Sequence, residues 1–192
     1  MLTRKERLEN FINSKKPSAV ITKVILASIA IGGFVTVAAI VPNMVSLLGR
    51  RGRFNSKKTY NAFSGLKRCG FIETIREKDG KEVVRITAKG ETRIKEFELD
   101  GLVIRRPWRW DRKWRMLIFD IPNRRRNARE ALRNKIKELG FYQLQKSVWV
   151  YPYSCHEEIM FVANFFEILP FVEILESKII LNEGKVKKFF GL

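Results

Sequence analysis

The sequence predicts an α+β protein made of two modules. The first observation is a helix, a glycine, a hairpin and a second helix over residues 54–98. The second is the order strand, helix, strand, strand, helix, strand over residues 113–176. The third is a formal net charge of +18 on 192 residues. This cationic excess exceeds what solubility requires and predicts a polyanionic partner, nucleic acid before an anionic membrane surface.

A basic arm, residues 1–17, opens the chain, and the first module is expected over residues 18–98. The segment Val24–Leu48 contains no charged residue. A run of this length is typical of a transmembrane helix. However, Gly32-Gly33 and Pro42-Asn43 interrupt it, and basic residues on both sides give no orientation. A membrane span is therefore the second interpretation of this segment.

The favoured interpretation of the apolar segment is a buried helix, Ser18–Ile40, followed by a short helix, Asn43–Gly49, in a protein core or a dimer interface. The first residues of the chain are polar and charged, so we expect no cleavable signal peptide. Cys69 and Cys155 lie far apart and have no metal-site or disulfide spacing. We therefore expect a cytoplasmic protein.

Residues 54–98 have the element order of a winged helix-turn-helix. Asn55 or Ser56 can cap a helix that runs to Arg68, and Gly70 ends it. Its buried face is expected to comprise Tyr60, Phe63 and Leu66. The elements expected next are strands Phe71–Ile75 and Val83–Thr87, with Asp79-Gly80 in their turn, and a helix from Ala88 or Lys89 to about Glu98.

The opposite face of the first helix is polar and basic, and in a winged helix-turn-helix it would enter the major groove. Lysine and arginine there serve phosphates and guanine edges, and Asn61 suits adenine. The alternative is an ordinary solvated helix face. The hairpin carries four acidic residues that would repel phosphate, which favours the helix as the contact. The predicted DNA contacts are Lys57, Lys58, Asn61, Ser64, Lys67 and Arg68.

Residues 99–112 are expected to connect the two modules. Trp108, Trp110 and the nearby Trp114 are interleaved with basic residues in the sequence RRPWRWDRKWR. Tryptophans on a basic strip can stack on bases, or they can pack against arginine and hold two domains together. We favour the second interpretation, because bulky tryptophans are rarely left fully exposed.

The second module, residues 113–192, is predicted to be a ferredoxin-like βαββαβ domain with a C-terminal tail. Its first strand, Met116–Phe119, ends at Asp120, and Pro122 prevents the strand from continuing. A helix follows, and Gly140 ends it. The apolar face of that helix is expected to comprise Ala128, Leu132, Ile136 and Leu139.

The remaining elements of this module follow the same order. Strands are expected at Phe141-Tyr142 and Val148–Val150. Ser154 and Glu157 have the spacing of a capping box that starts the second helix. The last strand is expected at Val172–Leu175.

Asp120 is the candidate catalytic and metal-binding residue, since a strand-terminal carboxylate can hold Mg²⁺ against a phosphodiester. One carboxylate per chain is too few for a tight site, so a dimer would have to bring two copies of Asp120 together. The alternative is that Asp120 forms an ion pair with Arg124, Arg125 or Arg126, or caps the following turn. The arginines predicted to contact nucleic acid are Arg124, Arg125, Arg126, Arg129 and Arg133.

The stretch RMLIFDIPNRRRNAREALRNKIKELGFYQLQKSVWVYPYSC resembles the ferredoxin-like domain of PaaX-type transcriptional repressors, which is similar to CRISPR-associated protein two. The preceding WDRKWR and the upstream winged helix also match the repressor type, so the resemblance covers about residues 50–176. It implies a dimer of ferredoxin-like domains, with Asp120 as the metal residue where the site is active. The features that carry the resemblance are LIFD, RRR, Gly140, Gln145, Ser147 and Val148.

We therefore expect a DNA-binding transcriptional regulator, a PaaX-like repressor, that binds duplex DNA as a homodimer and requires no cofactor. The ferredoxin-like domain would form the dimer. The first alternative is a metal-dependent nuclease or CRISPR-adaptation accessory protein that uses Asp120 and Mg²⁺. The second is a membrane-tethered DNA-binding protein anchored through residues 24–48. The CRISPR subunit lacks a winged helix, which favours the repressor.

Overall fold

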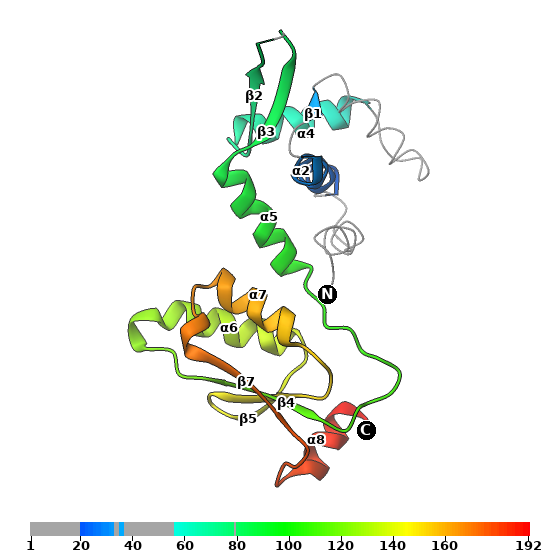
Figure 1. Ribbon diagram of the computed structural model, residues 1–192, viewed down its shortest axis with the longest axis vertical. Coiled ribbons are helices and arrows are strands. Elements are labelled where there is room, and N and C mark those ends of the chain that lie inside the picture. Colours follow the sequence, from blue (N-terminus) through cyan, green and yellow to red (C-terminus); the bar gives the residue numbers. More distant parts are fainter. Residues whose placement is uncertain (1–19, 33–34, 37–55, 79) are drawn as a thin grey trace. The chain divides into compact units, whose positions relative to one another are not determined.

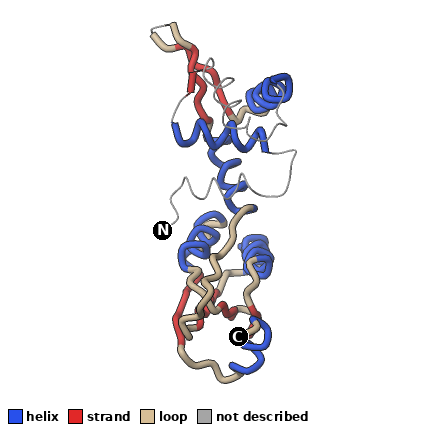
Figure 2. Tube along the Cα trace, turned by 90° about the vertical axis from the view of Figure 1, so that its right-hand side faces the viewer, coloured by secondary structure: helices blue, strands red, loops and turns tan. Residues whose placement is uncertain are grey.

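The chain folds into two compact units, Leu2–Gly101 and Leu102–Leu192. Each has its own sheet, three-stranded in the first and four-stranded in the second, together with helices (Figures 1 and 2). The α+β prediction is therefore confirmed. The residues that the computed structural model describes are 20–32, 35–36, 56–78 and 80–192.

The N-terminal unit combines helices with a small antiparallel sheet of strand order β1-β3-β2. The hairpin β2–β3 places Thr74 opposite Val84. The predicted succession of helix, hairpin and helix is present. The described elements are α2 (Val20–Gly32), β1 (Val35–Thr36), α4 (Ser56–Arg68), β2 (Ile72–Arg76), β3 (Glu82–Ile86) and α5 (Ala88–Asp100).

The apolar segment does not form one long helix. α2 ends at Gly32, and the strand β1 that follows pairs with β3, so the predicted helix Ser18–Ile40 is wrong. Two consecutive glycines weaken a helix, and the β-branched residues after them suit a strand. The predicted helix Asn43–Gly49 lies outside the described residues. Among the helices that are described, none has both the length and the apolar character needed to cross a bilayer.

α2 is a core helix, as predicted for the first part of the apolar segment. Ile25, Leu26 and Ile29 are buried in a cluster that also takes in residues of α4 and α5. The one charged residue of α2, Lys23, is buried as well, and its Nζ atom lies 5.3 Å from the centre of the Phe97 ring. A cation over an aromatic face is favourable when it is desolvated.

The inward face of α4 differs from the prediction at one position. Ala62, Phe63 and Leu66 pack against the core, whereas Tyr60 is exposed. Tyr60 precedes Leu66 by six residues, which is about 240° around an α-helix. The prediction that Tyr60 belongs to the buried face is therefore wrong.

The start of α5 is held against the chain that leaves α4. Thr87 is the N-cap: its Oγ1 atom accepts a hydrogen bond from the N–H of Gly90 at 3.1 Å and donates one to the carbonyl of Gly70 at 2.6 Å. Gly90 is buried, and a Cβ atom at this position would overlap the carbonyl oxygen of Phe71. Only glycine therefore allows the helix to approach the hairpin this closely.

In the C-terminal unit, α6 and α7 lie side by side over a four-stranded antiparallel sheet (Figure 1). The described elements of this unit are β4 (Trp114–Phe119), η3 (Asn123–Arg125), α6 (Arg126–Glu138), β5 (Tyr142–Gln145), β6 (Val148–Tyr151), α7 (His156–Phe165), η4 (Leu169–Phe171), β7 (Val172–Ser177) and α8 (Glu183–Phe190).

The strand order β5-β6-β4-β7, with every neighbouring pair antiparallel, is that of a ferredoxin-like fold. α6 connects β4 to β5 with β6 between them, and α7 connects β6 to β7 with β4 between them. The predicted βαββαβ domain is therefore confirmed. Leu117 and Phe119 of β4 are buried. Leu132 and Ile136 of α6 are buried as well, and they belong to the apolar helix face that the sequence predicts.

α8 covers part of the sheet face that α6 and α7 leave open. Val186 of α8 forms a buried cluster with Trp114 and Val150. Met116 lies on the same face, because it pairs with Val150 and side chains alternate along a strand. Leu175, opposite Met116 on β7, remains 52% exposed, so the cover is incomplete.

α7 does not begin at the predicted capping box. Its N-cap is Cys155 and not Ser154, and the cap residue makes no side-chain hydrogen bond to the helix. Cys155 is 1% exposed, and burial raises the pKa of its thiol to about 12. The cap position is thus occupied by a protonated core residue, because packing outweighs helix capping here.

We expect Gly90→Ala to destabilise the N-terminal unit by about 2 kcal/mol or more, because the added methyl group meets a backbone carbonyl that cannot rotate away. Urea unfolding followed by far-UV circular dichroism measures this. Gly65→Ala is the matched control: Gly65 lies inside α4 with nothing within 4 Å of its Cβ position. Alanine there should stabilise the unit by about 0.5–1 kcal/mol. Equal stabilities of the two variants would refute the tight packing at Gly90.

Candidate nucleic-acid interface

The outer face of α4 is polar and free of acidic residues. Asn61, Ser64, Lys67 and Arg68 are all exposed, and α4 contains no aspartate or glutamate. Lys57 and Lys58 lie in the first turn of α4, but their side chains are outside what the structure describes. Residues 61, 64 and 68 repeat at helical spacing and share one face, so the structure brings most of the predicted contacts of this helix together.

The hairpin beside α4 carries charges of both signs, and its basic residues Arg76, Lys78, Lys81 and Arg85 are exposed. Glu73, Glu77 and Glu82 are exposed on it or next to it. Carboxylates repel phosphate groups at short range. Carboxylates therefore offset the basic residues on the hairpin, whereas α4 carries no carboxylate, and this difference makes α4 the better candidate surface for a polyanion.

Three of the five arginines predicted to contact nucleic acid instead fasten loops of the C-terminal unit. Arg125 donates a hydrogen bond to the carbonyl of Glu167 at 2.7 Å. Arg129 donates to the carbonyl of Ile121 at 3.3 Å. Arg133 donates to the carbonyl of Lys146 at 3.0 Å.

These arginine contacts are long-range or cross an element boundary, so helical spacing alone could not reveal them. Each guanidinium keeps its charge, but its donors are partly used inside the fold. The side chains of Arg124 and Arg126 are exposed and make no hydrogen bond or ion pair with the described part of the chain. They are the arginines of this group that remain fully available to a ligand.

Asp120 is exposed at the end of β4, as predicted. Its backbone N–H donates to the carbonyl of Phe171 at 3.0 Å. Its carboxylate makes no hydrogen bond or ion pair with any described residue, so the alternative of an ion pair to Arg124, Arg125 or Arg126 is not formed. Three or more potential metal ligands do not come together anywhere in the described residues. One chain therefore does not supply a magnesium site from these residues.

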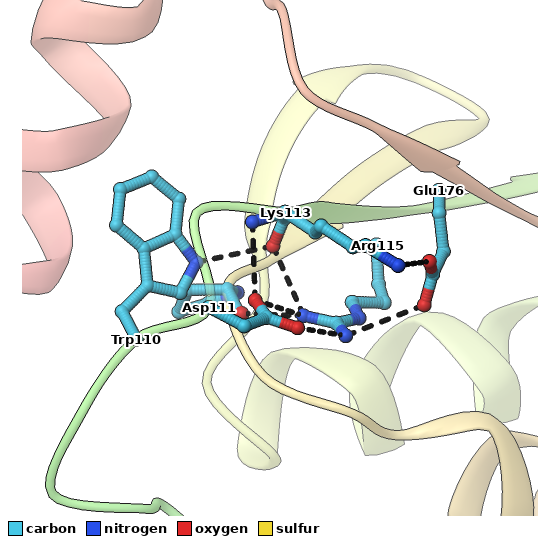
Figure 3. A network of polar contacts seen from close by, with 6 residues as sticks. Trp110, Asp111, Lys113, Arg115 and Glu176 are labelled. Atoms are coloured by element: carbon cyan, nitrogen blue, oxygen red, sulfur yellow. Dashed lines mark hydrogen bonds and ion pairs between the residues drawn. The ribbon is translucent and has the colours of Figure 1, made fainter.

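The opposite end of β4 carries a buried charge network that the sequence analysis missed (Figure 3). Arg115 donates to both carboxylate oxygens of Asp111, at 2.8 and 2.6 Å, and to the carbonyl of Pro152 at 2.9 Å. Glu176 of β7 lies 3.3 Å from the same guanidinium and 2.8 Å from Nζ of Lys113. The spacing of four residues between Asp111 and Arg115 was the available signal, but it stands out only in a helix.

The network fixes the last part of the connector to the sheet. The N–H of Lys113 donates to the Asp111 carboxylate at 3.0 Å, and the turn between them holds Arg112 at a φ of 60°. The Trp110 indole N–H donates to the carbonyl of Lys113 at 3.1 Å, and its ring lies 4.6 Å from that of Trp114. Two of the three connector-region tryptophans therefore pack within the C-terminal unit.

Charge pairing in this network lowers the pKa values of two carboxyl groups. The hydrogen bond from Arg115 holds the pKa of Asp111 below its ordinary value of 3.8. The hydrogen bond from Lys113 lowers the pKa of Glu176 in the same way. Both carboxylates are therefore ionised throughout the neutral range and neutralise the cations beside them.

Asp111→Asn should lower the free energy of unfolding of the C-terminal unit by about 1 kcal/mol at neutral pH, because the half-exposed Asp111 side chain is partly screened by water. Asparagine keeps an acceptor for the N–H of Lys113. Since the folded-state pKa of Asp111 is lowered, the charge pair stabilises the unit above the ordinary pKa and is lost as the pH falls through the folded-state value.

The difference in free energy of unfolding between the original chain and the Asp111→Asn variant should therefore be constant from about pH 7 to about pH 5. It should shrink below about pH 4. Urea unfolding at a series of pH values measures it. Glu173→Gln, at an exposed position of β7, is the matched control and should show no such difference. A pH-independent loss in Asp111→Asn would mean that the charge of Asp111 is not what stabilises the turn.

Comparison with known proteins agrees with this geometry. Residues 107–188 match the family model described as the PaaX protein central Cas2-like domain. The match spans all four strands of the ferredoxin-like sheet and includes both Asp120 and the Arg115 network. A search of curated proteins finds no match to the chain. The resemblance noted in the sequence is thus confirmed for the C-terminal unit, which contains a Cas2-like domain of the PaaX type over residues 107–188.

Proposed function

We propose that this protein is a DNA-binding transcriptional regulator of the PaaX type. The observation that carries the proposal is the exposed, acid-free face of α4, placed directly before a hairpin in the N-terminal unit. The match of residues 107–188 to the PaaX central Cas2-like domain supports a regulator in general. The reader of DNA would be the N-terminal unit, outside the matched domain.

The element order of the N-terminal unit supports a winged helix-turn-helix. A short strand, β1, pairs with β3 to give a three-stranded sheet. In this proposal the hairpin would be the wing and α4 would be the recognition helix. Asn61 is suited to adenine in the major groove, and Lys67 and Arg68 to phosphates or guanine. In this proposal sequence is read by α4, and affinity comes mainly from phosphate contacts.

A homodimer through the C-terminal unit would complete the regulator. The sheet face that α8 covers incompletely presents Leu175, and Ile179 and Leu181 after β7 are exposed as well. Apolar side chains gathered on one module indicate a surface that another protein can cover. A two-fold dimer would present two copies of α4, which matches the two half-sites that dimeric helix-turn-helix proteins read.

A metal-dependent nuclease is the second candidate. The observation that favours it is the exposed carboxylate of Asp120, which has no partner among the described residues of a Cas2-like domain. Such an enzyme would need Mg²⁺ and, because one chain offers a single carboxylate here, a second copy of Asp120. This requirement makes the nuclease the weaker candidate.

Reversing two charges on α4, in the double variant Lys57→Glu and Arg68→Glu, should abolish the gel shift of a duplex oligonucleotide at about 0.1 M salt, because two phosphate contacts become repulsions. The control is Lys95→Glu with Lys188→Glu, two exposed lysines of α5 and α8, which changes the net charge by the same amount. The control should bind within about threefold of the original chain. Equal binding by both double variants would remove α4 from the interface.

Asp120→Asn should leave duplex binding unchanged within about twofold, because Asp120 lies outside the α4 face. Neither the original chain nor the variant should cut single-stranded or duplex oligonucleotides in Mg²⁺ or Mn²⁺ when the protein is a regulator. Denaturing gels of labelled oligonucleotides measure this. Cleavage that requires metal and disappears in Asp120→Asn, but not in Glu173→Gln, would establish the nuclease in place of the regulator.

A further inference from the structure

The side chain of Trp108 is 96% exposed. The other three tryptophans are not: Trp114 and Trp149 are buried, and Trp110 packs on Trp114. An indole that stays in water forgoes the burial of a large apolar surface. Single exposed aliphatic residues are common, but a fully exposed tryptophan is unusual and is typical of a binding residue.

The short segment around Trp108 is held at both ends within the C-terminal unit. On one side Ile104 is buried, and Arg106 donates a hydrogen bond to the Tyr151 hydroxyl at 3.3 Å. On the other side Trp110 is held by the Lys113 carbonyl. The indole is therefore presented on a segment that is anchored at both ends, residues 105–109, which we call the arc. A ligand that binds an anchored segment loses less ordering entropy than one that binds a free segment.

The charge of the arc selects the partner. Arg105 and Arg109 of the arc are exposed, as is Arg112 just after it. Asp111 is the one acidic residue between 102 and 115, and its charge is neutralised by Arg115. A flat aromatic ring between exposed cations matches a base between phosphates. A base paired inside a duplex is stacked on both faces and is closed to an indole, so the matching ligand is an unpaired or unstacked nucleotide.

We infer that the arc from Arg105 to Arg109 is a second nucleic-acid contact, in which the Trp108 indole stacks on an unpaired base and Arg105 and Arg109 contact the flanking phosphates. The inference rests on the proposed function only in taking nucleic acid as the ligand. It does not require α4 to read a duplex. For Trp108 alone, it departs from the expectation, drawn from the sequence, that the tryptophans serve mainly to hold domains together.

The test is fluorescence anisotropy of the full chain with three labelled probes: a 20-nucleotide single strand, a matched 20-base-pair duplex, and the same duplex with an unpaired central bulge. Trp108→Ala should weaken binding to the single strand and the bulged duplex by about tenfold. It should leave the matched duplex within about twofold. Trp108→Phe keeps an aromatic face and should lose less than Trp108→Ala on each probe.

Val103→Ala is the matched control, because Val103 is also exposed and apolar but lies outside the arc; it should bind all three probes like the original chain. Trp108→Ala should unfold at an unchanged temperature, since the indole packs on little of the fold. If Trp108→Ala binds every probe normally, the inference is wrong. The same holds if its only effect is on stability or oligomeric state, which would mark a protein contact.

These outcomes separate the inference from the proposed function. Loss of matched-duplex binding in the α4 variants, with no effect of Trp108→Ala on any probe, supports the regulator and overturns the second contact. Binding of the original chain to the single strand alone, weakened in Trp108→Ala, supports the second contact and overturns the duplex-reading regulator.

Discussion

The arrangement of the C-terminal unit depends on one buried cation, the guanidinium of Arg115. A charge can be removed from water only where other groups replace its hydration. The replacements come from separate segments: Asp111 in the connector, the carbonyl of Pro152 after β6, and Glu176 on β7 (Figure 3). One side chain on the central strand β4 therefore holds the connector, a loop and the edge strand together. Removal of any partner leaves the charge under-compensated.

The same logic changes how the net charge of +18 is interpreted. The guanidinium of Arg115 is buried and hydrogen-bonds within the fold. Arg125, Arg129 and Arg133 each donate a hydrogen bond to a main-chain carbonyl. Within the described residues, exposed basic side chains lie on α4, at the start of α6, in the connector and on the hairpin β2–β3. Because counterion release counts the phosphates that are neutralised, affinity is set by these groups and not by the total number of basic residues.

The features that could be predicted from the sequence are those that depend on local periodicity. The ferredoxin-like order was readable because strands alternate, α6 has a clear apolar face and Gly140 ends it at a φ of 89°. The capping box predicted at Ser154 is not formed, because Cys155 is the N-cap and is buried in the core. Tyr60 lies off the buried face because it is about 240° around the helix from Leu66. The roles of Arg125, Arg129 and Arg133 were not predictable, because their acceptors are carbonyls in loops that only the fold brings near. Trp108 is exposed, although tryptophan side chains are rarely left fully exposed.

The two proposed contacts belong to different units, and this determines how they can act together. α4 is built on the N-terminal core through Leu66, whereas the arc that carries Trp108 is fastened to the C-terminal sheet through Arg106 and Trp110. Each contact can therefore bind without the other. A nucleic acid that offered a duplex next to an unpaired base would engage both, and the second contact would form at the effective concentration set by the connector.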